Sequence, residues 1–448
     1  MKKYDNYKES GIEWIGEIPE HWDESKIKYL SKEPNSLFID GDWIESKVII
    51  EEGIRYITTG NIKVGYYSEQ GAGFISEETF AELNCTEVFE GDLVISRLNN
   101  PIGRACIIPN LNNRIVTSVD NVIFRPDSNV NKFYLLYLFS SKEYFEVTDL
   151  ISRGATMQRI SRGLYGNIKI PLPSIEEQTT IANYLDHKTT QIDTLISKKE
   201  HFIKLLQEER IAVINQAVTK GLDPKVKMKD SGIEWLGEIP EHWKTARLNQ
   251  IIKVKDGTHE SPTQISKNET AFPLITSKDF KNGEINFDSA KYISKEDHEN
   301  IIKRSNTEKG DIIMSMIGGN IGNLVYIQTD REFSIKNVCL FKTSFNSIYA
   351  KHLYYILKSP LLKIQIDLCS RGGAQGFLSL GDLRSLLYFV LPEKEIKSIV
   401  LHIENEEIRI ETLIAKSQQE IEFLKEYKTA LISEVVTGKI DVREEVLN

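Results

Sequence analysis

Cysteines and long apolar runs are scarce in this sequence of 448 residues. Its four cysteines lie far apart and form no Cys-x-x-Cys pair, which excludes a disulfide scaffold and favours a reducing compartment. No stretch approaches the roughly 18 uncharged apolar residues of a membrane span. The opening MKKYDNYKES also lacks the apolar core of a signal peptide. We therefore expect a cytoplasmic protein that makes no membrane contact.

Catalytic motifs are also missing. The sequence has no Gly-rich loop ending in Lys-Ser/Thr for ATP, no HExxH, no Cys/His zinc spacing and no GxSxG elbow. His21 and His242 hold matching places beside tryptophans, a setting more typical of packing than of catalysis. We therefore expect no catalytic residue, metal site or cofactor on this chain, although a site built from scattered residues stays open.

The composition is that of an ordinary globular protein, with 40% hydrophobic and 27% charged residues. The length predicts two to three domains. The formal net charge of −9, taken over the whole chain, argues against nucleic acid as a partner, because phosphate binding needs a basic surface.

The sequence is an internal duplication with a period of about 220 residues. Residues 10–22 read SGIEWIGEIPEHW and residues 231–243 read SGIEWLGEIPEHW, so twelve of thirteen positions agree. Shorter echoes follow: GDLVIS and GDIIMS, SRGATMQ and SRGGAQ, QIDTLISK and RIETLIAK, VTKGLD and VTGKID. Such a period indicates two domains' worth of chain repeated once, and not a solenoid. Residues 25–90 and 245–305 show no clear similarity. The two halves therefore share a set of repeated motifs, called here the frame, but differ in the sequence of these stretches.

Each half is predicted to start with the Trp-bearing segment, continue through short strands and end in a long helix. Gly91-Asp92 and Gly310-Asp311 are typical of turns before a strand. Ser174, with Glu177 three residues later, is a capping-box pattern that predicts a helix running to about residue 218. The second long helix is expected at about 394–436. Short apolar runs that indicate strands of a mixed α/β or mostly β domain are 93–96, 168–170, 312–314 and 386–391.

The two long helices carry apolar residues at heptad spacing. Helices of this length, about 65 Å at 1.5 Å per residue, outrun the core of one small domain. We therefore expect them to pair with each other, although separate packing of each helix on its own domain is the alternative. The predicted seam consists of Leu185, Ile192, Leu195, Leu206, Val213, Ile403, Ile410, Leu413, Leu424 and Leu431.

Two unlike domains, each followed by a closely similar long helix, resemble the specificity subunit of a Type I restriction–modification enzyme. The SGIEW(I/L)GEIPEHW segment is similar to the one that starts each target recognition domain in that family. IPLPSIEEQTTIANYLDHKTTQID at 170–193 is similar to the family's strand–Pro–EQ–helix signature. The second copy departs from this signature, since Lys394-Glu395 stands in place of Glu-Gln, but it keeps its Leu-Pro and its heptads. The resemblance covers nearly the whole chain.

The resemblance implies an α+β fold of two globular α/β target recognition domains, joined by two long helices in an antiparallel coiled coil with internal pseudo-two-fold symmetry. Each variable domain would read one half of a bipartite double-stranded DNA target, and the helices would set the gap. Two readers on one face of a duplex lie about 34–36 Å or a related distance apart. The implied segments are 1–170 and 222–391 for the domains, and 171–221 and 392–448 for the spacer helices.

The resemblance also implies partners. The repeated frame would bind two adenine methylation subunits, which in turn would recruit ATP-driven motor-nuclease subunits of the restriction system. Those partners would supply the sites for S-adenosylmethionine, ATP and magnesium. This chain would be a non-catalytic subunit that carries no cofactor.

The net charge is unevenly distributed between the segments. Residues 25–165 carry 15 basic and 18 acidic groups, whereas residues 244–389 carry 20 basic and 15 acidic groups. Residues 392–448 have a net charge of −5, and the remaining −6 lies in 1–24 and 166–243. The second variable domain is therefore basic, as expected of a DNA reader, and the first is not. We expect tight DNA binding to need the basic surface of the methylation subunits.

Three loops carry candidate base readers, which are Arg, Lys, Asn, Gln, Ser or Thr side chains near a groove. Positions that differ between the halves suit base readout, and shared positions suit phosphate contact or architecture. Two pairs are shared between the halves, Arg153 with Arg371 and Gln158 with Gln375. They therefore suit phosphate contact or architecture better than base readout. Each candidate could also be an ordinary exposed loop residue. The full set for DNA contact is Arg97, Asn99, Asn100, Arg153, Gln158, Arg159, Arg162, Lys255, Thr258, His259, Asn320, Arg371 and Gln375.

Two other classes of function stay open at this point. A coiled-coil scaffold without DNA readout would explain the repeat and the helices, but not the two unlike domains. A stand-alone nuclease or other enzyme would need a motif that the sequence does not display. The target sequence itself is not readable, because no residue-to-base code applies to these loops.

Overall fold

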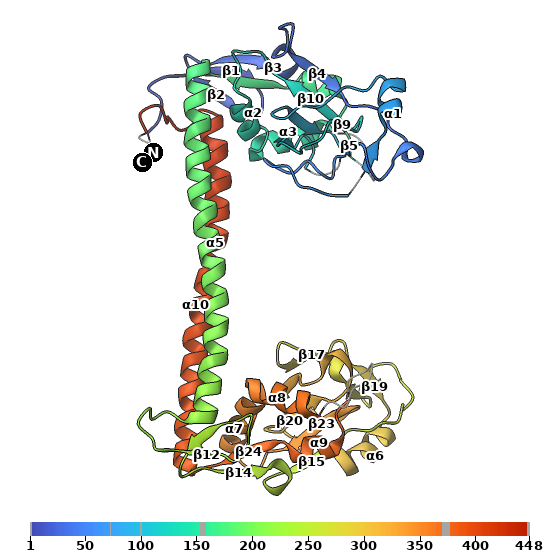
Figure 1. Cartoon of the computed structure of the whole chain (residues 1–448), viewed down its shortest axis with the longest axis vertical. Coiled ribbons are helices and arrows are strands. Elements are labelled where there is room, and N and C mark those ends of the chain that lie inside the picture. Colours follow the sequence, from blue (N-terminus) through green and yellow to red (C-terminus); the bar gives the residue numbers. More distant parts are fainter. Residues whose placement is uncertain (1, 72, 99–100, 153–157, 370–376, 446–448) are drawn as a thin grey trace. The chain divides into compact units, whose positions relative to one another are not determined.

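The computed structural model describes residues 2–71, 73–98, 101–152, 158–369 and 377–445. The chain forms two compact units, called here unit 1 (Met1–Lys199 with Gln418–Asn448) and unit 2 (Glu200–Ser417). The boundary between them falls inside both long helices, so each unit contains parts of both (Figure 1).

Unit 1 begins with a hairpin of the Trp-bearing frame segment, β1 (Tyr7–Ile12) with β2 (Gly16–Pro19). Strand β3 (Asp23–Lys26) then pairs with β11 (Lys169–Leu172), so the frame segment is tied to the strand that precedes the first long helix. A four-stranded antiparallel sheet has the order β4 (Leu37–Asp40), β10 (Asn121–Arg125), β7 (Leu93–Ser96), β8 (Ala105–Ile107). A three-stranded sheet has the order β6 (Gly73–Ile75), β5 (Ile54–Ile57), β9 (Ile115–Thr117). The helices are α1 (Glu77–Glu82), α2 (Lys132–Leu138), α3 (Lys142–Ile151) and α4 (Arg162–Gly166).

Unit 2 repeats this order of elements. The frame hairpin is β12 (Met228–Asp230) with β13 (Glu238–Pro240), and β14 (Lys244–Arg247) pairs with β24 (Leu387–Val390). The four-stranded sheet has the order β15 (Lys253–Asp256), β23 (Val338–Lys342), β20 (Ile312–Ser315), β21 (Leu324–Tyr326). The three-stranded sheet has the order β19 (Lys291–Ile293), β16 (Phe272–Ile275), β22 (Ser334–Ile335). A small hairpin, β17 (Phe280–Lys281) with β18 (Glu284–Ile285), follows β16. The helices are α6 (Lys295–Ser305), α7 (Ser347–Lys358), α8 (Pro360–Cys369) and α9 (Leu380–Ser385).

The two units share topology even where their sequences show no similarity. In unit 1, β5 runs parallel to β9 and antiparallel to β6; in unit 2, β16 runs parallel to β22 and antiparallel to β19. Of these strands, β5 and β6 lie within residues 25–90 and β16 and β19 within residues 245–305, the stretches that differ most in sequence. Burial constrains only the polarity of such positions, so the fold persists while residue identity drifts.

The two long helices are α5 (Ile175–Lys220) and α10 (Glu393–Val436), within two residues of their predicted bounds. Ion pairs between them run in opposite directions along the chain. Asp193 pairs with Lys428 at 2.7 Å in unit 1, and Arg210 pairs with Glu411 at 3.7 Å in unit 2. The helices are therefore antiparallel, as predicted. Exposed ion pairs of this kind contribute little to stability, so the apolar seam holds the helices together.

Most of the predicted seam is confirmed. The prediction is wrong for Leu195, which is 41% exposed. Ile196, four residues after the buried Ile192, instead packs against the core of unit 1. An α-helix of 3.6 residues per turn places the fourth residue on the seam at this point. The buried seam residues are Leu185, Ile192, Leu206, Ile403, Ile410 and Leu431. Those that are partly buried are Val213, Leu413 and Leu424, with Ile214 fully buried next to Val213.

Each unit completes its core with the end of the helix that starts in the other half of the sequence. The core of unit 1 surrounds Trp22 and includes Leu431, Val435 and Val436 from the end of α10. The core of unit 2 surrounds Trp243 and includes Val218 from the end of α5, together with Ile214 and Ala217. Neither domain therefore has a complete core without both helices. None of the helices among the described residues is long and apolar enough to cross a membrane.

Loss of a seam side chain is expected to destabilise unit 1 specifically. Leu431→Ala removes a side chain that is 1% exposed in this core, which costs roughly 2–5 kcal/mol for a buried leucine. Phe423→Ala is the matched control, since Phe423 lies on the same helix and is 57% exposed. Hydrogen–deuterium exchange should speed up in β7 and β10 for the Leu431 variant only. Equal effects of the two variants would contradict this account of the core.

Candidate nucleic-acid interface

The repeated histidine ties the frame segment to the start of each long helix. His21 Nε2 lies 2.8 Å from Glu177 Oε2 in unit 1, and His242 Nε2 lies 2.7 Å from Glu395 Oε2 in unit 2. Glu395 is therefore the counterpart of Glu177, so the signature glutamate is retained in the second copy. The residue that changes is the glutamine, Gln178, whose place is taken by the buried Ile396. Both histidines have an architectural role, as their packing position predicted.

The second oxygen of each glutamate is bound differently in the two units. In unit 1 the Tyr4 hydroxyl donates to Glu177 Oε1 at 2.8 Å, and in unit 2 Trp243 Nε1 donates to Glu395 Oε1 at 3.0 Å. Burial, together with the negative charge of Glu177, raises the pKa of Tyr4, so its hydroxyl stays a donor. The predicted cap is present as well, because Ser174 Oγ accepts from the Glu177 backbone N–H at 3.3 Å.

The Gly-Asp pairs before β7 and β20 form turns, as predicted. Gly91 and Gly310 have φ values of +84° and +90°, which glycine adopts without strain. The following aspartate is buried in each case. Asp92 binds the Arg125 guanidinium with two contacts of 2.7 Å, and Asp311 binds Lys342 Nζ at 2.6 Å. Each carboxylate thus joins two neighbouring parts of the four-stranded sheet.

Two of the predicted reader loops meet in each unit through the same short backbone bridge. In unit 1, Leu98 bridges Arg159, and the Ile160 N–H donates to the Arg97 carbonyl at 3.1 Å. In unit 2, the corresponding bridge joins Ile317 to Phe377, and the Leu378 N–H donates to the Met316 carbonyl at 3.0 Å. Serines cap the helices that follow, α4 and α9, in the same way. The backbone frame of the loops is therefore shared.

Arg97 is not an exposed reader, contrary to the prediction. It is 4% exposed, and its guanidinium binds Asp40 Oδ1 at 2.9 Å and the carbonyls of Val119 and Ile160. Burial lowers the pKa of Arg97, while the nearby Asp40 opposes this shift. Its contacts join β4, the loop before β10 and the loop before α4, so its role is internal support of the frame.

Arg159 and Arg162 are half-exposed at the rim of the same cluster. Arg159 Nη2 lies 2.8 Å from Asp120 Oδ1, and the Arg159 side chain is 46% exposed. Arg162 Nε lies 3.4 Å from Asp40 Oδ2, and its Nη1 donates to the Phe38 carbonyl at 3.1 Å. The Asp120 and Asp40 carboxylates are less exposed than these two guanidinium groups. The exposed guanidinium groups are suited to bind anions or acceptor atoms of bases.

Unit 2 places apolar residues on the same frame. Met316, Phe377 and Leu380 stand where unit 1 has Arg97, Arg159 and Arg162. Met316 is buried and Phe377 is exposed, as are their counterparts. The two units thus share the backbone architecture of these loops, but the side chains are charged in unit 1 and apolar in unit 2.

A second polar cluster in unit 2 surrounds Asp256, at the end of β15. Arg304 Nε donates to Asp256 Oδ1 at 3.1 Å, and His259 Nε2 lies 3.0 Å from Asp256 Oδ2. His259 Nδ1 lies 2.9 Å from Asn337 Oδ1. Burial would raise the pKa of Asp256, but hydrogen bonds from Arg304 and His259 outweigh it and the net pKa is lowered. Sequence reasoning found His259 but missed Arg304 and Asn337, which lie far along the chain on α6 and before β23.

The remaining predicted residues are dispersed. Lys255 and Thr258 are half-buried beside the Asp256 cluster, Gln158 is half-buried next to Arg159, and Asn320 is exposed. Thr258 Oγ1 accepts from the Glu260 N–H at 3.1 Å, which makes it a turn residue. The predicted residues Asn99, Asn100, Arg153, Arg371 and Gln375 lie outside the described residues.

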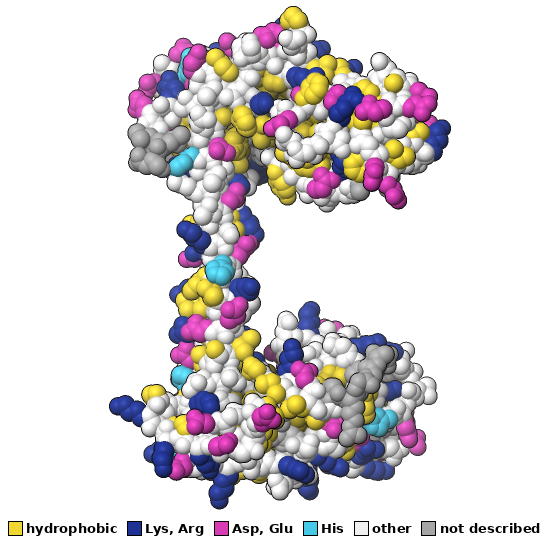
Figure 2. Space-filling view, viewed as in Figure 1, with side chains coloured by type: hydrophobic (Ala, Val, Ile, Leu, Met, Phe, Trp, Pro, Cys, Tyr) yellow, Lys and Arg dark blue, Asp and Glu magenta, His cyan; other side chains and the backbone are white. Residues whose placement is uncertain are grey.

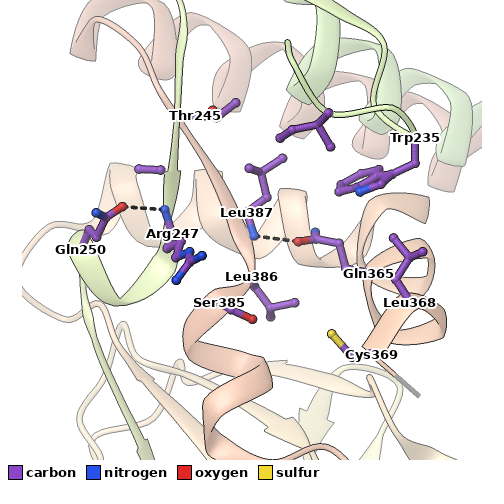
Figure 3. Close-up of a pocket in the computed structure, with 12 residues that line it drawn as sticks. Trp235, Thr245, Arg247, Gln250, Gln365, Leu368, Cys369, Ser385, Leu386 and Leu387 are labelled. Atoms are coloured by element: carbon purple, nitrogen blue, oxygen red, sulfur yellow. Dashed lines mark hydrogen bonds between the residues drawn. The ribbon is translucent and has the colours of Figure 1, made fainter. Parts of the chain in front are cut away.

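A hollow of about 420 Å³ opens in unit 2 beside the frame segment (Figure 3). Two of its polar side chains are engaged, since Gln365 Oε1 accepts from the Leu387 N–H at 2.7 Å and Gln250 Oε1 from the Arg247 N–H at 2.8 Å. Trp235 forms part of its wall. We assign no chemistry to it. Within the described ranges, no group of three or more His, Cys, Asp and Glu side chains is placed to hold a metal ion.

The surface charge follows the regional pattern in the sequence. On the face shown in Figure 2, Lys and Arg side chains are spread over unit 2, whereas Asp and Glu are frequent on unit 1. The basic domain is therefore the one that carries the apolar loop, and the arginine cluster lies in the more acidic domain.

The loops, the frame and the paired helices match known proteins over most of the chain. The family model described as Type I restriction modification DNA specificity domain matches residues 19–204 and again residues 240–423. The chain belongs to this family. Each match covers one recognition domain and ends inside a long helix, so the duplication and the α+β fold with two antiparallel helices are those of the family.

Full-length relatives and solved structures agree with this assignment. The chain is 26% identical to the putative type I restriction enzyme MjaX specificity subunit of Methanocaldococcus jannaschii, with 98% of each chain covered. It is 23% identical to the MjaVIII specificity subunit of the same organism, over 98% of this chain and 97% of the relative. The fold is similar to that of the HsdS subunit from Thermoanaerobacter tengcongensis, with a TM-score of 0.58, 13% identity, and 94% and 98% of the two chains covered. A chain from a type I R-M system assembly gives a TM-score of 0.66 at 13% identity, with 94% of this chain and 99% of that chain covered.

The burial of Arg97 predicts a large effect on stability. Arg97→Ala removes the cation beside Asp40 Oδ1 and the donor to two carbonyls, which is expected to cost roughly 2–4 kcal/mol. Arg159→Ala removes a half-exposed ion pair and should cost about 1 kcal/mol or less. Urea unfolding followed by tryptophan emission measures both. An Arg97 variant as stable as the wild-type chain would contradict the supporting role of this side chain.

Proposed function

We propose that the chain is the DNA-specificity subunit of a Type I restriction–modification complex, in which each unit reads one half of a bipartite double-stranded target. One observation carries this proposal: a shared loop frame presents an arginine cluster in unit 1 and apolar side chains in unit 2. Duplicated architecture with different side chains is what reading two different half-sites requires. No observation favours a scaffold without DNA readout.

The partners follow from the same proposal. The frame segment is repeated nearly unchanged, and the same His–Glu contact ties it to the start of each long helix, which suits docking of two copies of one methylation subunit. Motor-nuclease subunits would join through them, and S-adenosylmethionine, ATP and magnesium would be bound by the partners. The chain itself would be non-catalytic and would act in the cytoplasm, where the cell's DNA is accessible. Its net negative charge outside residues 244–389 supports a need for basic partner surface.

The proposal predicts a bipartite methylation pattern. Genomic N6-methyladenine should be mapped in a host that carries the intact operon and in a host lacking only this chain. We expect one split motif, with methylated adenine in each half, that disappears when this chain is absent. Methylation that persists unchanged without the chain, or a continuous motif, would contradict the assignment of specificity to it.

The helices are proposed to set the gap between the half-sites. Inserting one heptad into α5 after Lys199 and one into α10 after Ser417 preserves the seam and adds about 10.5 Å to each helix. The gap in the motif should then grow, by up to about three base pairs, while both half-sites stay the same. The control inserts five residues at the same places, which breaks the heptad register and should abolish methylation. An unchanged gap in a heptad variant that still methylates would contradict the spacer role.

A further inference from the structure

One position on the shared loop frame differs sharply between the units and is exposed in both. Arg159 and Phe377 are the second members of equivalent backbone bridges, and the residue after each is buried. Arg159 is 46% exposed and Phe377 is 56% exposed. The frame thus fixes the backbone and the direction of the chain at this position, and leaves the side chain as the variable.

The acidic partner of Arg159 is present only where the arginine is present. In unit 1 the Val119 N–H donates to the Asp42 carbonyl and Gly41 donates to the Asn121 carbonyl, so one residue, Asp120, lies between these two contacts. In unit 2 the corresponding contacts are made by two consecutive residues, Asn337 and Val338. Unit 2 therefore has no counterpart of Asp120 in this loop. The arginine and its carboxylate occur together, and the phenylalanine occurs without either.

The Asp120 carboxylate is well placed to orient Arg159. Its backbone carbonyl accepts from the Arg97 N–H at 2.9 Å, and Arg97 is itself fixed by Asp40. Asp120 Oδ1 lies 2.8 Å from Nη2 of the Arg159 guanidinium. A guanidinium carries five N–H donors, so this contact fixes the side chain without using up its capacity to donate. Holding a long side chain in place reduces the entropy lost when it binds.

The two side chains suit different bases. A pre-oriented arginine donates two hydrogen bonds to O6 and N7 of guanine in the major groove, which is the commonest specific protein–DNA contact. An exposed phenylalanine cannot donate, but it packs against the C5-methyl group that marks thymine in the same groove. Phosphate contacts carry no sequence information, whereas the side chain at this position differs in chemistry between the two units.

We propose that this position is a specificity-determining pair: Arg159 reads a guanine in the half-site bound by unit 1, and Phe377 reads a thymine in the half-site bound by unit 2. Asp120 acts through Arg159 as a positioning residue. This inference rests on the proposed function, and it adds the base chemistry of two positions in the target.

The test is a map of methylated motifs in a host that carries the intact operon with wild-type chain, Arg159→Ala or Phe377→Ala. Arg159→Ala should relax one guanine position in one half-site, with discrimination at that base falling roughly ten- to hundred-fold. The other half-site should be unchanged, which also shows that the complex assembles. Phe377→Ala should relax one thymine position in the other half-site. Asp120→Asn should relax the same base as Arg159→Ala, and no other.

Matched controls separate base reading from general surface effects. Arg114 in unit 1 is about as exposed and is also paired with carboxylates, and Phe345 in unit 2 is 66% exposed. Arg114→Ala and Phe345→Ala should leave the motif intact. If Arg159→Ala abolishes all methylation, Arg159→Lys provides the test. Lysine keeps the charge but lacks the guanidinium fork, so methylation should persist while discrimination at the same guanine position is lost.

Several outcomes would overturn the inference while leaving the proposed function intact. These are an unchanged motif in both alanine variants, relaxation at a base other than guanine or thymine, or a uniform loss of methylation with Arg159→Lys that spares no base. Absence of any bipartite motif with the wild-type chain would instead overturn the proposed function itself.

Discussion

The pairing of α5 with α10 is the interaction on which both units depend. Each helix starts at the frame of one unit, and its last turns fill the core of the other. A seam of buried Leu and Ile residues, and not the exposed ion pairs, supplies the stability of this exchange. Each unit therefore holds the start of one long helix and the end of the other within its own core.

The frame and the variable surface are separated in physical terms. The His–Glu ties, the Gly-Asp turns and the backbone bridges are hydrogen-bonded, and they recur in both units. The exposed side chains that differ between the units, such as Arg159 and Phe377, project from these elements. Their replacement leaves the core intact. Arg97 and Met316 mark the limit of this freedom, because both are buried and each suits only its own neighbours. Specificity can therefore change without loss of the fold only at positions more exposed than these two.

Much of the architecture could be predicted from the sequence. Strands β7 and β20 are buried on both faces and appear as continuous apolar runs, and the heptads gave both long helices to within two residues. The strands within 25–90 and 245–305 could not be matched between the two halves, because burial preserves the polarity of a position and not the identity of its residue. Arg97 looked like a loop reader because its partner Asp40 is 57 positions away, and no local spacing reveals such a contact. The pair Asp120 and Arg159 was hidden for the same reason.

The division of the chain has a consequence for its synthesis. Unit 2 is one continuous stretch, but unit 1 is closed by residues 418–448, which leave the ribosome after the whole of unit 2. At about 5–20 residues per second, the apolar seam of unit 1 waits roughly 10–45 s for its partner helix. During that time Leu185 and Ile192 lack the α10 residues that complete their core, so their apolar surface stays exposed in the nascent chain. Ribosomes that stop early release a chain whose second domain is nearly complete and whose first domain is not.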